Sequence, residues 1–193
     1  ELYDIQKDPG QQQNLADAHP KVVAQLRAEL ERVNQRNAEP DHRYVIGSDR
    51  HNPVEFTPDH WHGRKGLGWW QSGIIAGNGA PASIPVEVDR DGTYEFRLRR
   101  WPKAVNQPIS SAADVRIPSN AYGGTKVVSG KALPVVKARL KMRDYDKTID
   151  VTDNMLEAKF AVPLKKGKHE IHTEFLGNGG NRFGVHYLYV MRR

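Results

Sequence analysis

The sequence predicts a mainly β protein, an antiparallel β-sandwich preceded by one α-helix. Apolar residues recur at helical spacing only within residues 20–36, whereas beyond residue 84 they recur at every second position. Turns rich in Gly and Asn separate these alternating runs, and the last run, residues 185–191, is apolar at successive positions. Short strands, with one strand buried on both faces, are typical of a sandwich of two sheets.

Length and composition limit the kind of protein. A chain of 193 residues with 38% hydrophobic residues suits one domain of about 150 residues plus a shorter attachment. No apolar run approaches the roughly 18 residues of a membrane span, and the lack of cysteine excludes disulfides and a thiolate nucleophile. The net charge of +6 favours polyanions at long range. However, the cations are spread along the expected strands without a recognition helix, so no nucleic-acid partner is expected.

The first 36 residues contain the expected helix. An extended run, Leu2 to Ile5, leads to the breaker Asp8-Pro9-Gly10, and the helix begins at Pro20, where no amide hydrogen is needed. Its apolar residues form one stripe, which consists of Val22, Leu26, Leu30 and Val33. A polar segment containing Pro40 follows. Residues 1–36 and 44–193 are therefore expected to be separate domains, joined by a linker at 37–43.

The expected strands follow in chain order, each indicated by alternation of apolar and polar residues. They are residues 84–88, 94–98, 138–142, 156–164, 171–175 and 185–191. Turns are expected at Asp91-Gly92, at 165–168 and at 177–181. Residues 102–134 contain several Pro, Gly and Ser residues and are expected to form long loops.

Two stretches of the sequence resemble bacterial arylsulfatases of the formylglycine-dependent family. Residues 1–36 resemble the C-terminal strand, turn and helix of the catalytic fold. From about residue 68 the chain resembles the domain appended to many of these enzymes, through the runs Trp69-Trp70-Gln71-Ser72-Gly73, Gly92-Thr93-Tyr94-Glu95-Phe96, Ala138-Arg139-Leu140-Lys141 and Phe160-Ala161-Val162-Pro163-Leu164. The Gly-x-Tyr-x-Phe strand and the Pro-Leu-x-x-Gly-x-His turn also look like a jelly roll of galactose-binding-like type, to which many carbohydrate-binding modules belong.

This resemblance implies the C-terminal, non-catalytic part of a sulfuric ester hydrolase. The catalytic domain would precede Glu1 and would hold the calcium and the formylglycine, so this chain would carry no catalytic residue, metal site or cofactor. The resemblance also implies a periplasmic or secreted protein, with its own catalytic domain as the partner in cis. A second copy, bound through residues 1–36, is a further candidate partner.

Three local motifs have both a chemical and a structural interpretation, and the structural one is preferred for each. Ser83-Ile84-Pro85-Val86-Glu87 approaches the Ser-x-Pro-x-Arg motif that is converted to formylglycine, but it has Glu in place of Arg and alternates like a strand. Asp153-Asn154 is similar to the family's metal-binding pair, yet Asp and Asn between strands usually form a turn. Asp59-His60-Trp61-His62 places two histidines at i and i+2, which suits zinc, but hydrogen-bonded histidines are commoner.

Tryptophan and arginine supply the candidate ligand-binding residues, which are Trp101, Arg97, Arg99, Trp61, Trp69 and Trp70. Aromatic rings offer flat faces to sugar rings, and arginine binds anionic groups. Trp101 shares the parity of Arg97 and Arg99, so all three are expected on the outward face of one strand. Structural packing is the alternative for each tryptophan.

Two functions therefore remain open. In the first, the sandwich packs on and supports a sulfatase catalytic domain. In the second, it is a carbohydrate-binding module for a sulfated or acidic glycan, held by the face with Trp101, Arg97 and Arg99. An independent enzyme is disfavoured, because no nucleophile, base and orienting group occur at workable spacing.

Overall fold

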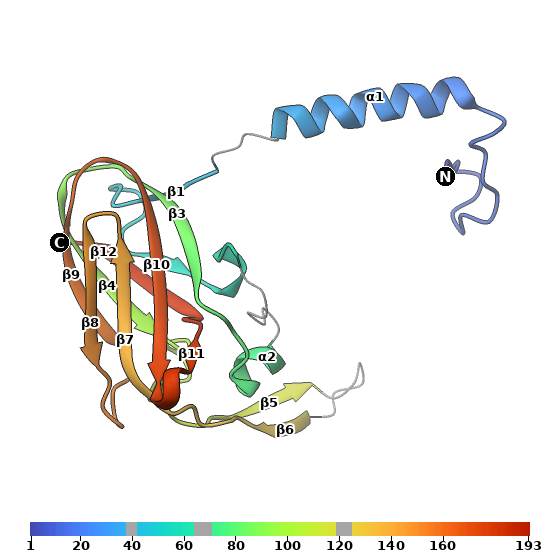
Figure 1. Cartoon of the computed structure of the whole chain (residues 1–193). Coiled ribbons are helices and arrows are strands. Elements are labelled where there is room, and N and C mark those ends of the chain that lie inside the picture. The colour runs from blue at the N-terminus through green and yellow to red at the C-terminus, as the bar shows by residue number, and fades with distance from the viewer. Residues whose placement is uncertain (38–41, 64–70, 119–124) are drawn as a thin grey trace. The chain divides into compact units, whose positions relative to one another are not determined.

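The structure is a computed structural model that describes residues 1–37, 42–63, 71–118 and 125–193 (Figure 1). It divides into two compact units, Glu1–His42 and Arg43–Arg193. The first unit contains one long helix, and the second is a sandwich of β-sheets. The predicted fold class, a β-sandwich preceded by one α-helix, is confirmed.

Helix α1 of the first unit spans Pro20–Asn37 and begins at the predicted proline. Val22, Leu26 and Leu30, which belong to its apolar stripe, are 40%, 56% and 59% exposed. The helix therefore presents an apolar face to its surroundings, as an amphipathic helix does before it is packed against a partner.

The segment before the helix is a loop, and the extended run expected from Leu2 to Ile5 ends at a turn that includes Ile5. The backbone turns after Asp4, whose carbonyl accepts the amides of Lys7 and Asp8 at 3.1 and 2.7 Å. The Leu2 carbonyl accepts the amide of Leu15, which ties the loop to itself. An extended segment needs a paired neighbour to become a strand, and the described residues place no strand beside this one.

The larger sheet, sheet A, has the strand order β1-β3-β10-β7-β8, and the short β11 also pairs with β10. Its strands are β1 (Tyr44–Ile46), β3 (Ala82–Val88), β7 (Val135–Met142), β8 (Tyr145–Asp150), β10 (Gly167–Gly177) and β11 (Arg182–Phe183). β1 and β3 pair in parallel, and the other pairs are antiparallel.

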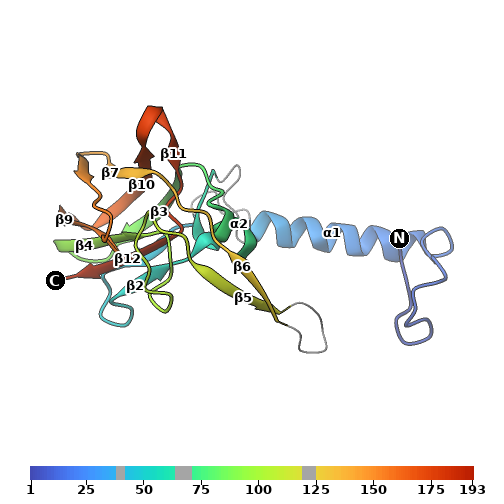
Figure 2. The ribbon, with the colours of Figure 1, turned by 90° about the horizontal axis from the view of Figure 1, so that it is seen from below.

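The smaller sheet, sheet B, has the strand order β2-β12-β4-β9 and is antiparallel throughout. Its strands are β2 (Val54–Phe56), β4 (Gly92–Arg99), β9 (Ala158–Leu164) and β12 (Tyr187–Arg192). Figures 1 and 2 show the two sheets stacked as the layers of a sandwich. Sheet B therefore has one face toward the core and one outer face.

The core lies between the two sheets and follows the alternation of the strands. On β9, Ala158, Phe160, Val162 and Leu164 are buried, and the residues between them are exposed. The same parity buries Tyr94, Phe96 and Leu98 of β4. A buried side chain of this size contributes roughly 1.5–3 kcal/mol, so this interior is the main source of stability.

The segment expected to form long loops, residues 102–134, contains more regular structure than predicted. β5 (Asp114–Pro118) and β6 (Thr125–Ser129) form a two-stranded antiparallel ribbon. Alternating β-branched residues in these two runs favour strands and outweigh the Pro and Gly content around them. The remaining elements are α2 (Gln71–Ala76) and the 3-10 turns η1 (Pro58–His60) and η2 (Asn178–Gly180). Among the described residues, no helix has the length and apolar character of a membrane span.

Candidate functional site

Two of the four tryptophans expected to bind sugar, Trp61 and Trp101, are each only 1% exposed. Trp61 belongs to the main core, and its Nε1 donates to the His186 carbonyl at 3.1 Å. Their expected role as ligand platforms is wrong, because neither ring has an accessible face. Trp69 and Trp70 lie outside the described residues.

Trp101 packs into a second, smaller cluster and not onto the outer face of β4. Strand β4 ends at Arg99, so its alternation no longer sets the direction of Trp101. The Arg100 guanidinium lies 4.4 Å from the centroid of the Trp101 ring. A Cβ at Gly130 would lie 2.6 Å from the Ala113 carbonyl oxygen and 3.3 Å from the Trp101 ring, so glycine is required there. The other apolar members of this cluster are Ile74, Ile75 and Ala113.

Arg97 and Arg99 lie together on the outer face of sheet B, where they line a hollow of about 560 Å³. We call it the basic hollow. Its other lining residues are Lys103, Asn106, Leu156, Glu157 and Lys159. Within the described part of the chain, four cationic side chains and one carboxylate line it, which leaves an excess of positive charge.

The pairing of β4 with β9 brings these charges together. Arg97 lies opposite Lys159, and the same register brings Arg99 level with Glu157, just before β9. Directly opposed side chains on antiparallel strands lie about 5 Å apart, close enough to interact. The segment after β4 adds Asn106, which has a φ of 49°, a left-handed conformation that asparagine adopts more readily than most residues.

Glu157 holds the two guanidinium groups in place. Its Oε1 accepts from Arg97 Nη1 at 3.3 Å, and its Oε2 accepts from Arg99 Nη1 at 3.1 Å. Lys159 Nζ lies 3.2 Å from Oε1, and Arg97 is also paired with Glu95. Burial raises the pKa of Glu157, but hydrogen bonds from Lys159 and Arg99 outweigh it and lower the pKa below its ordinary value. The carboxylate is therefore ionised at neutral pH.

Arg99 is held almost entirely inside the protein. The residue is 4% exposed, and its Nε donates to the Trp101 carbonyl at 3.1 Å. Its Nη2 is enclosed and has no hydrogen-bond partner among the described residues. A buried donor without a partner costs about 1–3 kcal/mol. Arg99 therefore contributes its charge to the basic hollow, whereas its Nη2 is not accessible to a ligand.

Lys103 is held at the hollow by Tyr189 of β12. Its Nζ lies 4.0 Å from the centroid of the Tyr189 ring, and its backbone amide donates to the Tyr189 hydroxyl at 3.3 Å. That hydroxyl donates to Glu55 at 2.8 Å. Burial raises the pKa of Tyr189 to about 12, so it remains a neutral phenol. Tyr189 is therefore buried on the outer face of sheet B, in agreement with the prediction that residues 185–191 are covered on both faces.

The three local motifs occupy structural positions. Ser83 lies on β3, where its hydroxyl donates to Glu170 at 2.6 Å. Asp153-Asn154 forms a turn. His60 Nδ1 accepts the amide of Thr57 at 3.1 Å at the start of η1. The described residues contain no group of three or more His, Asp or Glu side chains suited to a metal ion.

Sequence reasoning found two residues of the basic hollow and missed the rest. Glu157 and Lys159 share the outward parity of the run 156–164, so their signal was present in the sequence. Lys103 and Asn106 carried no such signal, because their positions depend on how the segment after β4 folds back. Tyr189 was expected to be buried, but its contact with Lys103 was not expected.

No family model matches this chain, and neither does any curated protein. Among solved structures, the chain is similar to a ruminal endo-β-1,4-mannanase, with 15% identity, a TM-score of 0.32, and coverage of 59% of this chain and 18% of that one. It is also similar to an exo-β-1,3-galactanase from Phanerochaete chrysosporium with β-1,3-galactotriose, with 11% identity, a TM-score of 0.38, and coverage of 72% and 29%. This chain thus spans less than a third of either enzyme. By their descriptions, both are carbohydrate-active enzymes, and neither is a sulfatase.

Proposed function

We propose that the sandwich, residues 43–193, is a non-catalytic module that binds an acidic glycan in the basic hollow. The bound group would be a sulfate ester or a carboxylate on a sugar. The single observation that carries this proposal is the excess of positive charge in the hollow, where four cationic side chains and one carboxylate are the charged lining groups among the described residues.

The chemistry of arginine supports an oxyanion as the bound group. A guanidinium is planar, always charged, and matches the oxygens of a sulfate or carboxylate with two parallel donors. Arg97 is only 31% exposed and Arg99 5%, measured on their side chains, so water screens them less than it screens charges on an open surface. Glu157 fixes both groups in advance, which reduces the ordering that binding requires.

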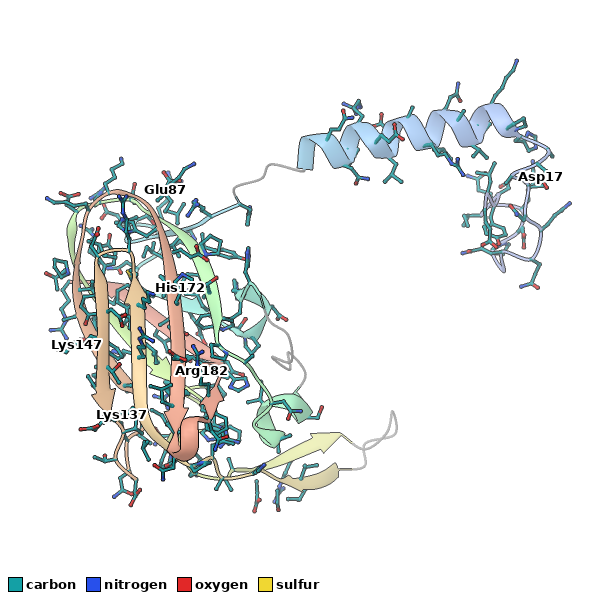
Figure 3. The ribbon with its side chains drawn as sticks, in the orientation of Figure 1. Asp17, Glu87, Lys137, Lys147, His172 and Arg182 are labelled. Carbon is teal, nitrogen blue, oxygen red and sulfur yellow. The ribbon has the colours of Figure 1, made fainter. Side chains whose placement is uncertain are left out.

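Titration calorimetry at physiological ionic strength with dextran sulfate and unsulfated dextran tests the proposal. We expect the chain to bind dextran sulfate and not dextran, and the substitution Arg99→Gln to weaken binding by about tenfold, because one of the four cations of the basic hollow is lost. The matched control is Arg182→Gln on β11 of sheet A (Figure 3), which removes the same charge from a side chain that is 58% exposed. Equal weakening by both substitutions would mean that only the net charge attracts the polymer, and the proposal would be wrong.

A second function rests on α1. We propose that the apolar stripe of α1 packs against the catalytic domain of an arylsulfatase, of which this chain would be the C-terminal, non-catalytic part. The exposure of Leu26 and Leu30 favours it, because burial of two such side chains would contribute roughly 3–6 kcal/mol. Calcium and formylglycine would then belong to that domain, and the protein would be periplasmic or secreted. This chain alone is expected not to hydrolyse aryl sulfates, and turnover above that of a heat-killed control would contradict the assignment.

Without such a partner, the same stripe is expected to bring two copies together. Sedimentation velocity should show a homodimer that the double substitution Leu26→Glu and Leu30→Glu converts to a monomer. The matched control is Arg27→Glu and Glu31→Arg, which changes neighbouring residues outside the apolar stripe. A chain that is monomeric at all concentrations would contradict this dimerisation.

A further inference from the structure

A second hollow, of about 330 Å³, lies beside the basic hollow on the outer face of sheet B. It is lined by Glu55 and Tyr189, by Pro53 and Pro102, and by Lys103 and Ala104. Lys103 lines both hollows, so they share one wall. Both volumes fall within the range found for ligand pockets, about 300–1,000 Å³, and the second hollow is near its lower end.

The strand register joins the two hollows into one line across the sheet. Glu55 of β2 lies opposite Tyr189 of β12, Tyr189 lies opposite Arg97 of β4, and Arg97 lies opposite Lys159 of β9. These four residues therefore form a row across all four strands. Since neighbouring strands lie about 4.8 Å apart, the row is about 14 Å long. That length exceeds what a single anionic group would occupy.

The chemistry changes along this row. At the Lys159 end, cations are in excess. At the Glu55 end, the only charges lining the second hollow are the Glu55 carboxylate and the Lys103 ammonium, among the described residues. Glu55 Oε1 accepts from the Tyr189 hydroxyl at 2.8 Å, and the side chain is exposed, so it can still accept hydrogen bonds from a ligand. A carboxylate repels a second anion and suits hydroxyl groups, while the proline rings supply apolar surface.

We propose that the second hollow binds the uncharged sugar next to the acidic one, so that the site takes an acidic oligosaccharide of at least two units. The acidic unit lies over Arg97 and Arg99, and the neutral unit lies between Glu55 and the two prolines. Tyr189 is a positioning residue, which holds Lys103 as the wall between the two units. This inference rests on the proposed function of the basic hollow.

NMR titration with two probes tests it: galactose 3-sulfate, and 3′-sulfolactose, in which the same sulfated galactose is joined to an uncharged glucose. We expect the chain to bind 3′-sulfolactose about tenfold more tightly, because further hydrogen bonds form with the carboxylate. Glu55→Gln should remove most of this difference while preserving the acceptor for Tyr189. Ala104→Phe fills the second hollow and should also remove most of this difference, because the larger side chain excludes the uncharged sugar. Glu87→Gln on β3 removes an exposed carboxylate from sheet A and is the matched control (Figure 3).

The outcomes separate the two proposals. If the chain binds neither probe, the basic hollow is not an anion site, and both proposals are overturned. If it binds both probes equally, and neither Glu55→Gln nor Ala104→Phe changes the affinities, the basic hollow remains an anion site and only the second hollow is rejected. If Glu55→Gln weakens both probes equally, Glu55 acts on the basic hollow itself, and the inference is also wrong.

Discussion

Arg99 and Arg100 are neighbours in the chain, and both are buried, yet they have different partners. Arg99 donates to the carboxylate of Glu157 and to one backbone carbonyl. Arg100 is completely buried and donates to the carbonyls of Ser111, Ile75 and Lys131 at 2.9, 3.2 and 2.6 Å. No carboxylate is paired with it among the described residues. Burial lowers the pKa of Arg100 to about 10.

The difference shows that burial of an arginine does not by itself indicate a binding site. Arg100 donates from its two terminal nitrogens to backbone carbonyls of three separate segments, so it ties those segments together beside Trp101. Arg99 instead shares the Glu157 carboxylate with Arg97 at the wall of the basic hollow. Each of the two has one buried nitrogen without a partner among the described residues, so that feature does not distinguish them. We therefore assign a structural role to Arg100 and a binding role to Arg99.

The largest expected effect comes from removing Arg100. Arg100→Met should lower the free energy of unfolding by about 3 kcal/mol or more, because three carbonyls that are buried or partly buried lose their donor, at about 1–3 kcal/mol for each that is left without a partner. Urea unfolding measures the change. If Arg99→Met, the matched substitution of the adjacent residue, proves more damaging than Arg100→Met, our comparison of the two arginines is wrong.

His186 is expected to make the folding stability depend on pH. Its pKa is lowered to about 4, mainly by burial and also by the charge of Arg100. An unfolded histidine titrates near 6.5, so the unfolded state binds more protons between pH 4 and 6.5. Stability contributed by the neutral ring is present above about pH 6.5 and is lost as the pH falls toward 4. The loss is about 3 kcal/mol, at about 1.4 kcal/mol for each pKa unit.

Urea unfolding of the natural chain and of His186→Phe at several pH values between 4 and 7 measures this dependence. The variant should show a shallower loss of stability on acidification, whatever its absolute stability. Parallel curves would show that His186 is protonated in the folded protein, and that the region around Arg100 tolerates a second positive charge.

Removal of Arg99 is expected to affect binding more than folding. Arg99→Met should cost only about 1 kcal/mol of folding stability, because Glu157 keeps Arg97 and Lys159 as partners and the substitution also removes the buried, unpartnered Nη2, whose burial costs about 1–3 kcal/mol. Binding to dextran sulfate should nevertheless fall. Thermal unfolding and titration of the same sample would separate the two effects. Full stability together with full binding would remove Arg99 from the site.

The smallest effect is expected from removing the first unit. Residues 43–193 should unfold cooperatively with a midpoint within about 2 °C of the full chain, because this unit has its own core. Calorimetry of the truncated chain and of the full chain measures the two midpoints. Arg99 and Arg100 both lie in the retained unit, so the difference in stability between Arg99→Met and Arg100→Met should be the same in the truncated chain. Aggregation or a broad transition would show that α1 belongs to the core of the sandwich.

Local patterns in the sequence were sufficient to predict the long helix and six of the twelve described strands, namely β3, β4, β7, β9, β10 and β12. Alternation found Ala158 to Leu164 because the side-chain direction on a strand depends only on position along it. The same rule placed Arg97 and Arg99 on one face. It failed for Trp101, because the rule ends where the strand ends, and the chain turns Trp101 inward after Arg99.

Periodicity in the sequence was sufficient to establish the fold class, the stripe of α1, and the inward and outward faces of the predicted strands. Which strands became neighbours, and what covers the outer face of sheet B, depended on tertiary packing. It placed Glu157 beside Arg99 through the β4–β9 register and Lys103 over Tyr189 through the segment after β4. The physical reason is that periodicity arises from local backbone geometry, whereas these contacts join residues far apart in the chain and depend on how the whole sandwich packs.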